Sequence, residues 1–449
     1  MKFKSLTAIV AAAAAFTFSA CGSDSPDNPE KPSTPDTPDT PTEVGAVVPT
    51  DIVYQVNPRF YGNSDCFKAI TADLGRIADM GCNVVWLMPI QEPGELKSVG
   101  SPYCIRNYKA INPKYGTDAD LKTLVETAHA KGLKVVLDWV ANHTAWDHAW
   151  ITEAPELYKK DNKGNIVQAN TWADVAQLDY SNAGTATAMQ DAMKYWVDNF
   201  DVDGFRCDYA EGVPHTFWSA AIKNIAKQDF IWLAETQQSA FYNDGFGMIY
   251  DWNFAPTMSS AFKNGKYSTI VDKAKESNGN VPEGKSILRY VFNHDVAAEN
   301  EVDKMFGSAD AIPAAYVLAA MFNGTPMIYS SMDVEGLTGK QSFFNYTTLT
   351  FSQALSDKFK AINKAFAQTA TVRGGKFADY TTDGDVVCFA YTLNDNAAIV
   401  VVNPSGEKKS VKSPISFRGD KMTELISGTT AELPAAIELE PYGYKIFSK

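Results

Sequence analysis

The sequence predicts a (β/α)8 barrel followed by a small antiparallel β domain, and three observations support this prediction. Eight short apolar runs recur between residues 51 and 330. Longer amphipathic stretches separate these runs, as expected for helices that connect parallel strands. After about residue 372 the pattern changes to alternating strands and turns, such as "DVVCFAYTL" and "AAIVVVNPSG". Eight runs match the strand count of a closed barrel, although an open doubly wound sheet would show the same alternation.

The eight runs are nearly continuous in apolar residues and rich in β-branched side chains, which suits strands that are buried on both faces. They occupy residues 51–56, 83–89, 133–140, 202–208, 230–235, 247–252, 286–293 and 324–330. The segment "GTDADLKTLVETAHAKG" at 116–132 predicts a helix that Asp118 caps and Gly132 ends. The connection between the third and fourth runs is much longer than the others. It predicts a functional excursion over about residues 141–185.

The first 49 residues lie outside the predicted barrel. Residues 1–20 combine Lys2 and Lys4 with the apolar run "LTAIVAAAAAFTF", which predicts a secretory signal peptide too short to span a bilayer comfortably. The following "SACG" resembles a bacterial lipobox, so Cys21 is the expected lipidation site. An ordinary cleaved signal is the alternative. Residues 21–49 are rich in Pro, Thr and Asp and predict a tether that cannot bury a core.

Charge and membrane signals limit the classes of partner. The formal net charge of −13 argues against a nucleic-acid partner, which needs a basic surface. No segment beyond the signal is long and apolar enough to cross a membrane, so anchoring would depend on the lipid alone. The acidic stretch after Cys21 resembles the surface-export signals of Bacteroidetes lipoproteins. We expect an outer-membrane lipoprotein at the cell surface, with a periplasmic or secreted protein as the alternative.

Carboxylates lie at the ends of several predicted strands. Asp138, Asp208 and Glu235 end or nearly end their runs, and Asp295 follows the seventh. In a barrel these ends converge on one face, where active sites lie. Because side chains alternate along a strand, Arg206 and Asp208 should both point toward the barrel axis.

Such carboxylates suit chemistry at a glycosidic bond. We expect Arg206 to lower the pKa of Asp208 and keep it ionised, as a nucleophile requires. Glu235 follows an apolar strand, where desolvation would raise its pKa into the range of a general acid. Glycosidases use such a pair, in which the ionised carboxylate is the nucleophile and the protonated carboxyl group is the general acid. Taken singly, each residue would more simply be a helix cap or an ion-pair partner.

Four stretches resemble the signature regions of the α-amylase family of glycoside hydrolases. They are "DWVANH" (138–143), "GFRCD" (204–208), "AE" (234–235) and "NHD" (293–295), in the family's order on the expected strands three, four, five and seven. The segments "GSPYCIRNYKAINPKYGT" (100–117) and "GTPMIY" (324–329) resemble further parts of that family. The similarity implies a catalytic barrel over residues 50–371 and a C-terminal β domain over residues 372–449.

The resemblance also implies a retaining mechanism on the α-glucosidic bonds of starch or malto-oligosaccharides. Asp208 would be the nucleophile that forms a covalent glucosyl ester, Glu235 the general acid and base, and Asp295 the stabiliser of the transition state. Asp138 would have a supporting role. The implied substrate-binding residues are Tyr103, His143, Arg206 and His294.

One departure from the family pattern concerns calcium and the acceptor side. After Asp208 the sequence reads "YAEG", where many α-amylases carry a Lys-His pair. Asn142 keeps the family's usual side-chain ligand for calcium, and Asp174 in the long excursion could supply another. A Ca2+ site at these two residues therefore stays open, and no organic cofactor is expected.

Three other functions remain as alternatives. A transglycosylase would share the covalent intermediate, and a non-catalytic glycan-binding lipoprotein of a starch-uptake complex would share the fold. Relatives of the second kind have usually lost one or more of the three carboxylates, which this chain retains. A metal-dependent hydrolase using His143, Asp147 and His148 is disfavoured because the sequence has five histidines and no HExxH pattern. Candidates to stack on sugar rings are Trp146, Trp150 and Trp172.

Overall fold

The structure is a computed structural model that describes residues 50–449. The predicted signal peptide, the tether and the lipidation site Cys21 lie outside the described residues. Within residues 50–449, no helix combines the length and apolar character needed to cross a membrane.

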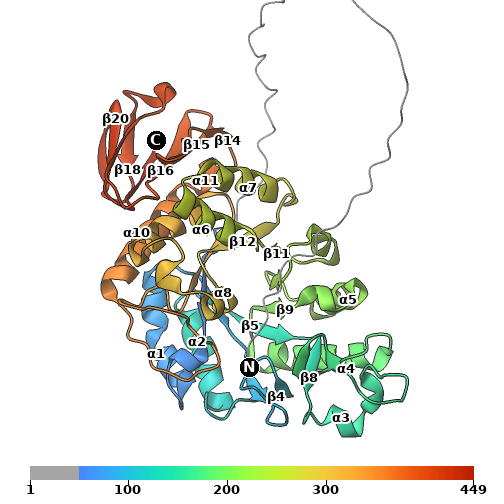
Figure 1. The fold of residues 1–449 in the computed structure, drawn as a ribbon. Coiled ribbons are helices and arrows are strands. Elements are labelled where there is room, and N and C mark those ends of the chain that lie inside the picture. The colour runs from blue at the N-terminus through green and yellow to red at the C-terminus, as the bar shows by residue number, and fades with distance from the viewer. Residues whose placement is uncertain (1–49) are drawn as a thin grey trace, which may run out of the picture. The chain divides into compact units, whose positions relative to one another are not determined.

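Eight parallel strands close into a barrel, as the sequence predicts (Figure 1). They are β1 (Val53–Val56), β2 (Val84–Leu87), β5 (Lys134–Val140), β9 (Gly204–Asp208), β10 (Ile231–Ala234), β11 (Met248–Tyr250), β12 (Ser286–Tyr290) and β13 (Thr325–Tyr329). Each strand pairs with the next barrel strand along the chain, and β13 pairs with β1 to close the barrel. All eight predicted runs are therefore barrel strands, and the open-sheet alternative is excluded.

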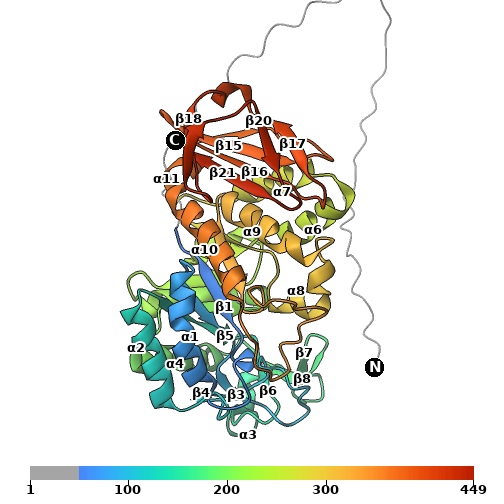
Figure 2. The ribbon, with the colours of Figure 1, turned by 90° about the vertical axis from the view of Figure 1, so that its left-hand side faces the viewer.

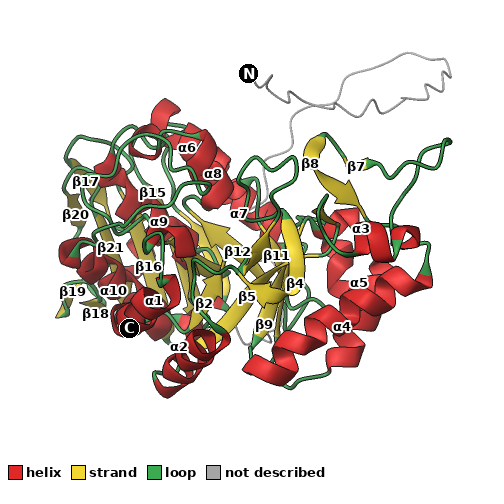
Figure 3. Cartoon of the chain, turned by 90° about the horizontal axis from the view of Figure 1, so that it is seen from below, coloured by secondary structure: helices red, strands yellow, loops and turns green. Residues whose placement is uncertain are grey.

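Helices surround the barrel strands (Figure 3). They are α1 (Cys66–Asp79), α2 (Asp118–Ala130), α4 (Ala183–Phe200), α5 (His215–Ile225), α6 (Phe254–Asn264), α7 (Ser268–Asn278), α8 (His294–Glu299), α9 (Ile312–Met321) and α10 (Gln353–Gln368). The expected N-cap of α2 is wrong by one residue. Thr117 caps the helix, because its side chain accepts from the backbone N–H of Asp120 and the Asp120 carboxylate accepts from Thr117 in return. Gly132 follows the helix with a φ of +75°, which glycine adopts without strain.

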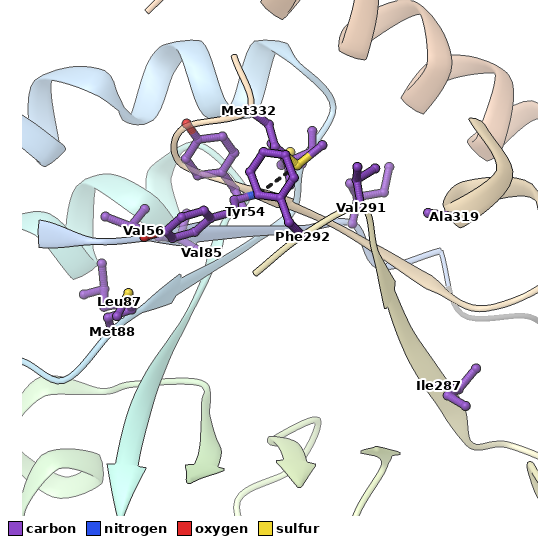
Figure 4. Packing of buried hydrophobic residues seen from close by; sticks show 14 of the residues in the cluster. Tyr54, Val56, Val85, Leu87, Met88, Ile287, Val291, Phe292, Ala319 and Met332 are labelled. Atoms are coloured by element: carbon purple, nitrogen blue, oxygen red, sulfur yellow. Dashed lines mark hydrogen bonds between the residues drawn. The ribbon is translucent and has the colours of Figure 1, made fainter. Parts of the chain in front are cut away.

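The two faces of the barrel strands are buried against different partners. Phe205 and Cys207 of β9 belong to the large apolar layer between strands and helices, whereas Arg206 lies in the barrel interior, as alternation predicts. In Figure 4, Tyr54 and Val56 of β1 lie beside Val85 of β2 in this outer layer. The polar side chains of the site therefore enter the barrel from strands whose other face is apolar.

Two insertions interrupt the alternation of strands and helices. A hairpin of β3 (Gln91–Pro93) and β4 (Ile105–Ile111) follows β2 and was not expected from the sequence. The long excursion after β5 contains β6 (His143–Ala145), α3 (Trp150–Glu153), β7 (Gln168–Ala169) and β8 (Trp172–Gln177). Its three strands form a small antiparallel sheet in the order β6-β8-β7.

The C-terminal part is an antiparallel β domain, as expected. Its six-stranded sheet contains β14 (Lys376–Asp379), β15 (Val387–Leu393), β16 (Asn396–Val402), β21 (Tyr444–Ser448), β18 (Lys421–Glu424) and β19 (Thr429–Glu432), and β17 (Lys409–Lys412) pairs with β20 (Ala436–Leu439). The sheet contacts α9 and the short helix α11 (Ala370–Arg373), which lie below it in Figure 2. Phe322 stacks on Phe389 at 4.2 Å between ring centroids, so aromatic packing joins the two domains.

The five cysteines of the described chain are all buried and free, so no disulfide supports this part of the fold.

Gly204 opens β9 in very close contact with its neighbours. A Cβ there would lie 2.5 Å from the Ile231 carbonyl oxygen and 2.9 Å from Val136 Cγ2. We expect Gly204→Ala to lower the free energy of unfolding by about 1–3 kcal/mol, because the strand contacts must spread to admit the methyl group. Urea denaturation measures this loss. Gly247→Ala is the control, since its nearest contact would be an ordinary 3.8 Å. Equal losses in the two variants would contradict the steric explanation.

Candidate active site

The guanidinium of Arg206 is the centre of the polar site. Its Nη1 lies 2.7 Å from Asp138 Oδ1 and 3.0 Å from Asp208 Oδ1, and its Nη2 lies 2.8 Å from Glu235 Oε2. Register explains this convergence, because Arg206 of β9 pairs with Asp138 on one side and Leu233 on the other. Nε also donates to the Tyr250 hydroxyl at 3.1 Å. The Arg206 side chain is fully buried.

The three candidate catalytic carboxylates differ in exposure. Asp208 ends β9 and Glu235 follows β10, and each side chain is 13% exposed. Asp295 lies in the first turn of α8, is 39% exposed and has its Oδ2 3.3 Å from His294 Nε2. Asp208 and Glu235 are thus held inside the barrel mouth, and Asp295 is open to a ligand.

The expectation that Arg206 keeps the pKa of Asp208 low is wrong. Burial raises the pKa of Asp208 to about 7, and the opposing effect of Arg206 does not offset it. The nearby charges of Asp138 and Asp295 raise this pKa further. One guanidinium is shared among several carboxylates in a poorly hydrated site, so desolvation and like-charge repulsion dominate.

The neighbouring carboxylates follow the same rule. Burial raises the pKa of Glu235 to about 7, as expected for a general acid, and the charge of Asp208 adds to the effect. Desolvation and the charge of Glu235 raise the pKa of Asp295 to about 7, although its carboxylate is partly exposed, and burial raises the pKa of Asp138 to about 6. Near neutral pH, the cluster therefore holds both protonated and ionised carboxyl groups, as acid catalysis next to a nucleophile requires.

The hydrogen bonds of Glu235 indicate which of its oxygens carries the proton. The backbone N–H of Tyr209 donates to Oε2 at 2.6 Å, and Arg206 Nη2 lies beside the same atom. Because neither group can accept a proton, neutral Glu235 must carry its proton on Oε1. This contribution of Tyr209 was not expected from the sequence.

Tyr209 donates this hydrogen bond from a left-handed backbone conformation, with φ of 40° and ψ of 52°. Such a conformation is costly for a bulky side chain. Gly212 makes the turn possible, because a Cβ there would lie 2.2 Å from Tyr209 Cε1 and 2.7 Å from Asn142 Oδ1. The glycine of "YAEG" is thus required by packing, which gives this departure from the family pattern a structural reason.

A chain of hydrogen bonds lines the base of the site. The Gln55 amide nitrogen is 2.8 Å from His294 Nδ1, His294 Nε2 is 2.7 Å from the Tyr103 hydroxyl, and Tyr103 donates to Asp138 Oδ2 at 3.0 Å. Since an amide nitrogen can only donate, His294 accepts at Nδ1 and donates from Nε2 to Tyr103. Burial holds the pKa of His294 well below its usual value, so the ring is neutral.

Two residues of this base were not predicted. Gln55 interrupts an apolar strand, and Trp86 donates from Nε1 to Asp138 Oδ2 at 3.2 Å. The available signal was a polar or aromatic residue at an inward-facing position of a predicted strand.

An aromatic rim lies beside the carboxylates. His143 is buried, and burial lowers its pKa to about 4. Trp172 is 38% exposed, with ring-centroid distances of 5.4 Å to His143 and 5.3 Å to Tyr209. Of the other candidate tryptophans, Trp150 packs on His148 at 4.5 Å and Trp146 lies under the Lys97 ammonium at 3.7 Å. Of the three candidate tryptophans, Trp172 is therefore the one that lies at the site.

The expected calcium ligands do not fit a common site. Register pairs His143 with Gln177 and Ala145 with Val175, so Asn142 and Asp174 lie at opposite ends of the paired segment. Their positions differ by four residues, or about 13 Å along a strand. Asn142 Oδ1 already accepts a hydrogen bond from Gln177 at 3.0 Å. The proposed pair therefore cannot chelate one ion in this arrangement.

The alternative of a His143-Asp147-His148 metal centre also lacks support. His148 Nδ1 accepts from the Trp150 backbone N–H, and the Asp147 carboxylate accepts from the Glu95 backbone N–H. Across residues 50–449, no group of three or more His, Cys, Asp or Glu side chains could hold a metal ion.

Comparison with known proteins agrees with this geometry. Residues 62–165 match the family model of the α-amylase catalytic domain. The α-amylase MalA of Haloarcula japonica is 28% identical over 400 residues, which cover 84% of this chain and 58% of that protein. A cyclomaltodextrinase of Geobacillus thermopakistaniensis is 24% identical, covering 87% of this chain and 71% of that protein. The chain thus spans less than two thirds of the first relative's length.

A solved structure extends the similarity over the whole fold. The maltogenic α-amylase AmyB of Thermotoga neapolitana superposes with a TM-score of 0.77 and 28% identity, covering 89% of this chain and 98% of that one. The chain is thus similar, over its barrel and its C-terminal sheet, to proteins named as α-amylases.

Proposed function

We propose that this protein hydrolyses the α-glucosidic bonds of starch or malto-oligosaccharides with retention of configuration. The observation that carries the proposal is the convergence of Asp208 and Glu235 on one buried guanidinium at adjacent strand ends. Retaining glycosidases need a nucleophilic carboxylate and an acid carboxyl group close together. The raised pKa values supply both protonation states near neutral pH.

In the first step, ionised Asp208 attacks the anomeric carbon while Glu235 donates its Oε1 proton to the departing glycosidic oxygen. The products are a glucosyl ester on Asp208 and a free sugar hydroxyl. In the second step, Glu235 removes a proton from water, the water oxygen attacks the anomeric carbon, and the ester bond to Asp208 breaks. Both carboxyl groups then regain their starting protonation states.

The remaining residues bind and orient the sugar. Asp295 is the most exposed of the three carboxylates and is proposed to accept hydrogen bonds from sugar hydroxyls that strengthen in the transition state. The chain from Gln55 through His294 to Tyr103 fixes the Tyr103 ring, which stacks on His294 with a centroid distance of 5.4 Å. Neutral His143 can hydrogen-bond a hydroxyl without adding positive charge near Arg206. Both ring nitrogens of His294 are already bonded to Gln55 and Tyr103, so His294 orients Tyr103 instead.

A cavity of about 390 Å3 lies next to the "YAEG" turn, and its volume suits glucose units. Glu211 and Gln238 lie in its wall, and Glu211 accepts from Thr236, the residue after Glu235. If a sugar hydroxyl rather than water attacks the glucosyl ester on Asp208, the same intermediate gives transglycosylation. Product analysis of maltoheptaose, amylose and pullulan digests distinguishes the two outcomes and reveals the linkage preference.

We further propose that Cys21 is lipidated and anchors the enzyme to the outer membrane, facing the cell surface, where a starch-uptake complex is a candidate partner. The lipobox-like sequence and the proline-rich tether support this proposal.

The leaving-group dependence of two variants tests the assigned roles. Asp208→Asn should lose on the order of 10⁴-fold or more of kcat on both maltoheptaose and α-maltosyl fluoride, because both need the nucleophile. Glu235→Gln should lose about 10²–10⁴-fold on maltoheptaose and much less in the fluoride-releasing step, since fluoride departs without a proton. Glu126→Gln, which changes an exposed side chain of α2, is the control and should keep wild-type activity. Wild-type activity in Asp208→Asn would overturn the hydrolase proposal.

Stability should depend on pH through Asp208. Its raised folded-state pKa favours folding at low pH, and this contribution is lost as pH rises from 3.8 through about 7. Asp208→Asn removes the charged form, so calorimetry should show a larger gain in Tm over wild type at pH 8 than at pH 5. Asp272→Asn, which changes an exposed side chain of α7, should show the same Tm change at both pH values. Equal gains at both pH values would contradict the raised pKa.

Membrane attachment can be tested in cells. Cys21→Ala should move the protein from the membrane fraction to a soluble fraction, because the thiol that receives the lipid is missing. Fractionation with immunoblotting measures the shift, and Cys66→Ala, which changes a buried thiol of α1, is the control. Retention of Cys21→Ala in the membrane fraction would refute lipidation at this site.

A further inference from the structure

A buried polar node joins the excursion to the barrel beside the active site. It consists of the Gln177 side chain, Asn142 and the Leu178 carbonyl. The Gln177 amide nitrogen donates to the Asn142 backbone oxygen at 2.9 Å, to Asn142 Oδ1 at 3.0 Å and to the Leu178 oxygen at 3.2 Å. Gln177 is 9% exposed and Asn142 is 1% exposed.

The chemistry of this node is that of a cation site filled by a nitrogen atom. Three oxygens, two of them backbone carbonyls, converge on one point, and such oxygens are ligands of the type that Ca2+ prefers. The amide nitrogen has only two hydrogens for the three acceptor oxygens, so two of these oxygens share one hydrogen. Without this donor, the buried Asn142 Oδ1 and the Leu178 oxygen would lose a hydrogen-bond partner, whereas the Asn142 backbone oxygen would keep its bond from the Leu178 N–H at 3.2 Å.

The node also lies at a functional position. Asn142 lies between β5 and β6, Gln177 ends β8, and Leu178 follows that strand. Gly212 packs against Asn142 Oδ1 and against the ring of Tyr209, whose N–H donates to Glu235. The node therefore connects the excursion to the turn that orients the acid.

We propose that the Gln177 amide takes the place of a structural calcium ion in this chain. Gln177 is thus a positioning residue that fastens the excursion to the barrel without metal. The expected ligand pair Asn142 and Asp174 is kept apart by strand register, and Asn142 Oδ1 accepts from Gln177 instead. This proposal concerns stability and metal response, so it does not depend on the substrate proposed above.

Metal response of the purified protein gives the first test. The Tm of the wild type should change by less than about 1 °C between excess EDTA and 5 mM CaCl2, because the amide already occupies the position of the ion. Differential scanning fluorimetry measures this. A rise of several degrees with calcium, or a comparable fall with EDTA, would overturn the proposal, since Gln177 would then not replace the ion.

Charge substitution at the node gives the second test. Gln177→Glu should lower the Tm by at least about 3 °C in EDTA, because a carboxylate would face three acceptor oxygens. Added calcium should restore most of this loss, since the carboxylate and the three oxygens together form a cation site. Gln177→Met should lose stability without any calcium response, as it supplies neither donor nor ligand.

Gln168→Glu is the matched control, because Gln168 lies exposed on β7 of the same small sheet. It should leave Tm and calcium response unchanged. No recovery of Gln177→Glu with calcium would show that the oxygens are not arranged for a cation. A wild-type Tm in Gln177→Met would show that the amide contacts do not hold the excursion. Should Gln177→Glu fail to fold, the wild type and Gln177→Met still decide the proposal.

Discussion

Arg206 lies fully buried at the centre of the barrel mouth, within 3.0 Å of carboxylate oxygens on three neighbouring strands. A buried guanidinium is stable only when its charge is paired and its donors are used. Asp138 meets this need from the adjacent strand and is itself held by Trp86 and Tyr103. The positions of Asp208 and Glu235 follow, because both reach the same cation from the ends of their strands.

One cation does not neutralise so many carboxylates, and this imbalance connects stability with function. Desolvation raises the pKa values of Asp208, Glu235 and Asp295 toward neutrality, which costs stability when they ionise. Tyr209 adds a strained backbone to the same region. The apolar layer outside the barrel supplies the rigidity that keeps these unfavourable groups in place. The site is therefore preorganised by burial rather than by a balanced set of ion pairs.

Several elements were predictable because their signals are local. The eight barrel strands are continuous apolar runs, and strand alternation correctly directed Arg206 into the barrel and Phe205 out of it. The hairpin of β3 and β4 was missed because β3 has only three residues and β4 is largely polar at alternate positions. The α2 cap was misplaced by one residue, since Thr117 and Asp118 are both residues that cap helices.

The sequence by itself determined the barrel, the order of its strands and the carboxylates at their ends, because hydrophobic periodicity and strand alternation are properties of neighbouring residues. Only the tertiary structure decided how those groups behave. The pKa of Asp208 depends on burial and on charges from other strands, so the presence of Arg206 two residues away did not predict its direction. Likewise, Asn142 looked like a metal ligand until the fold placed Gln177 against its oxygens.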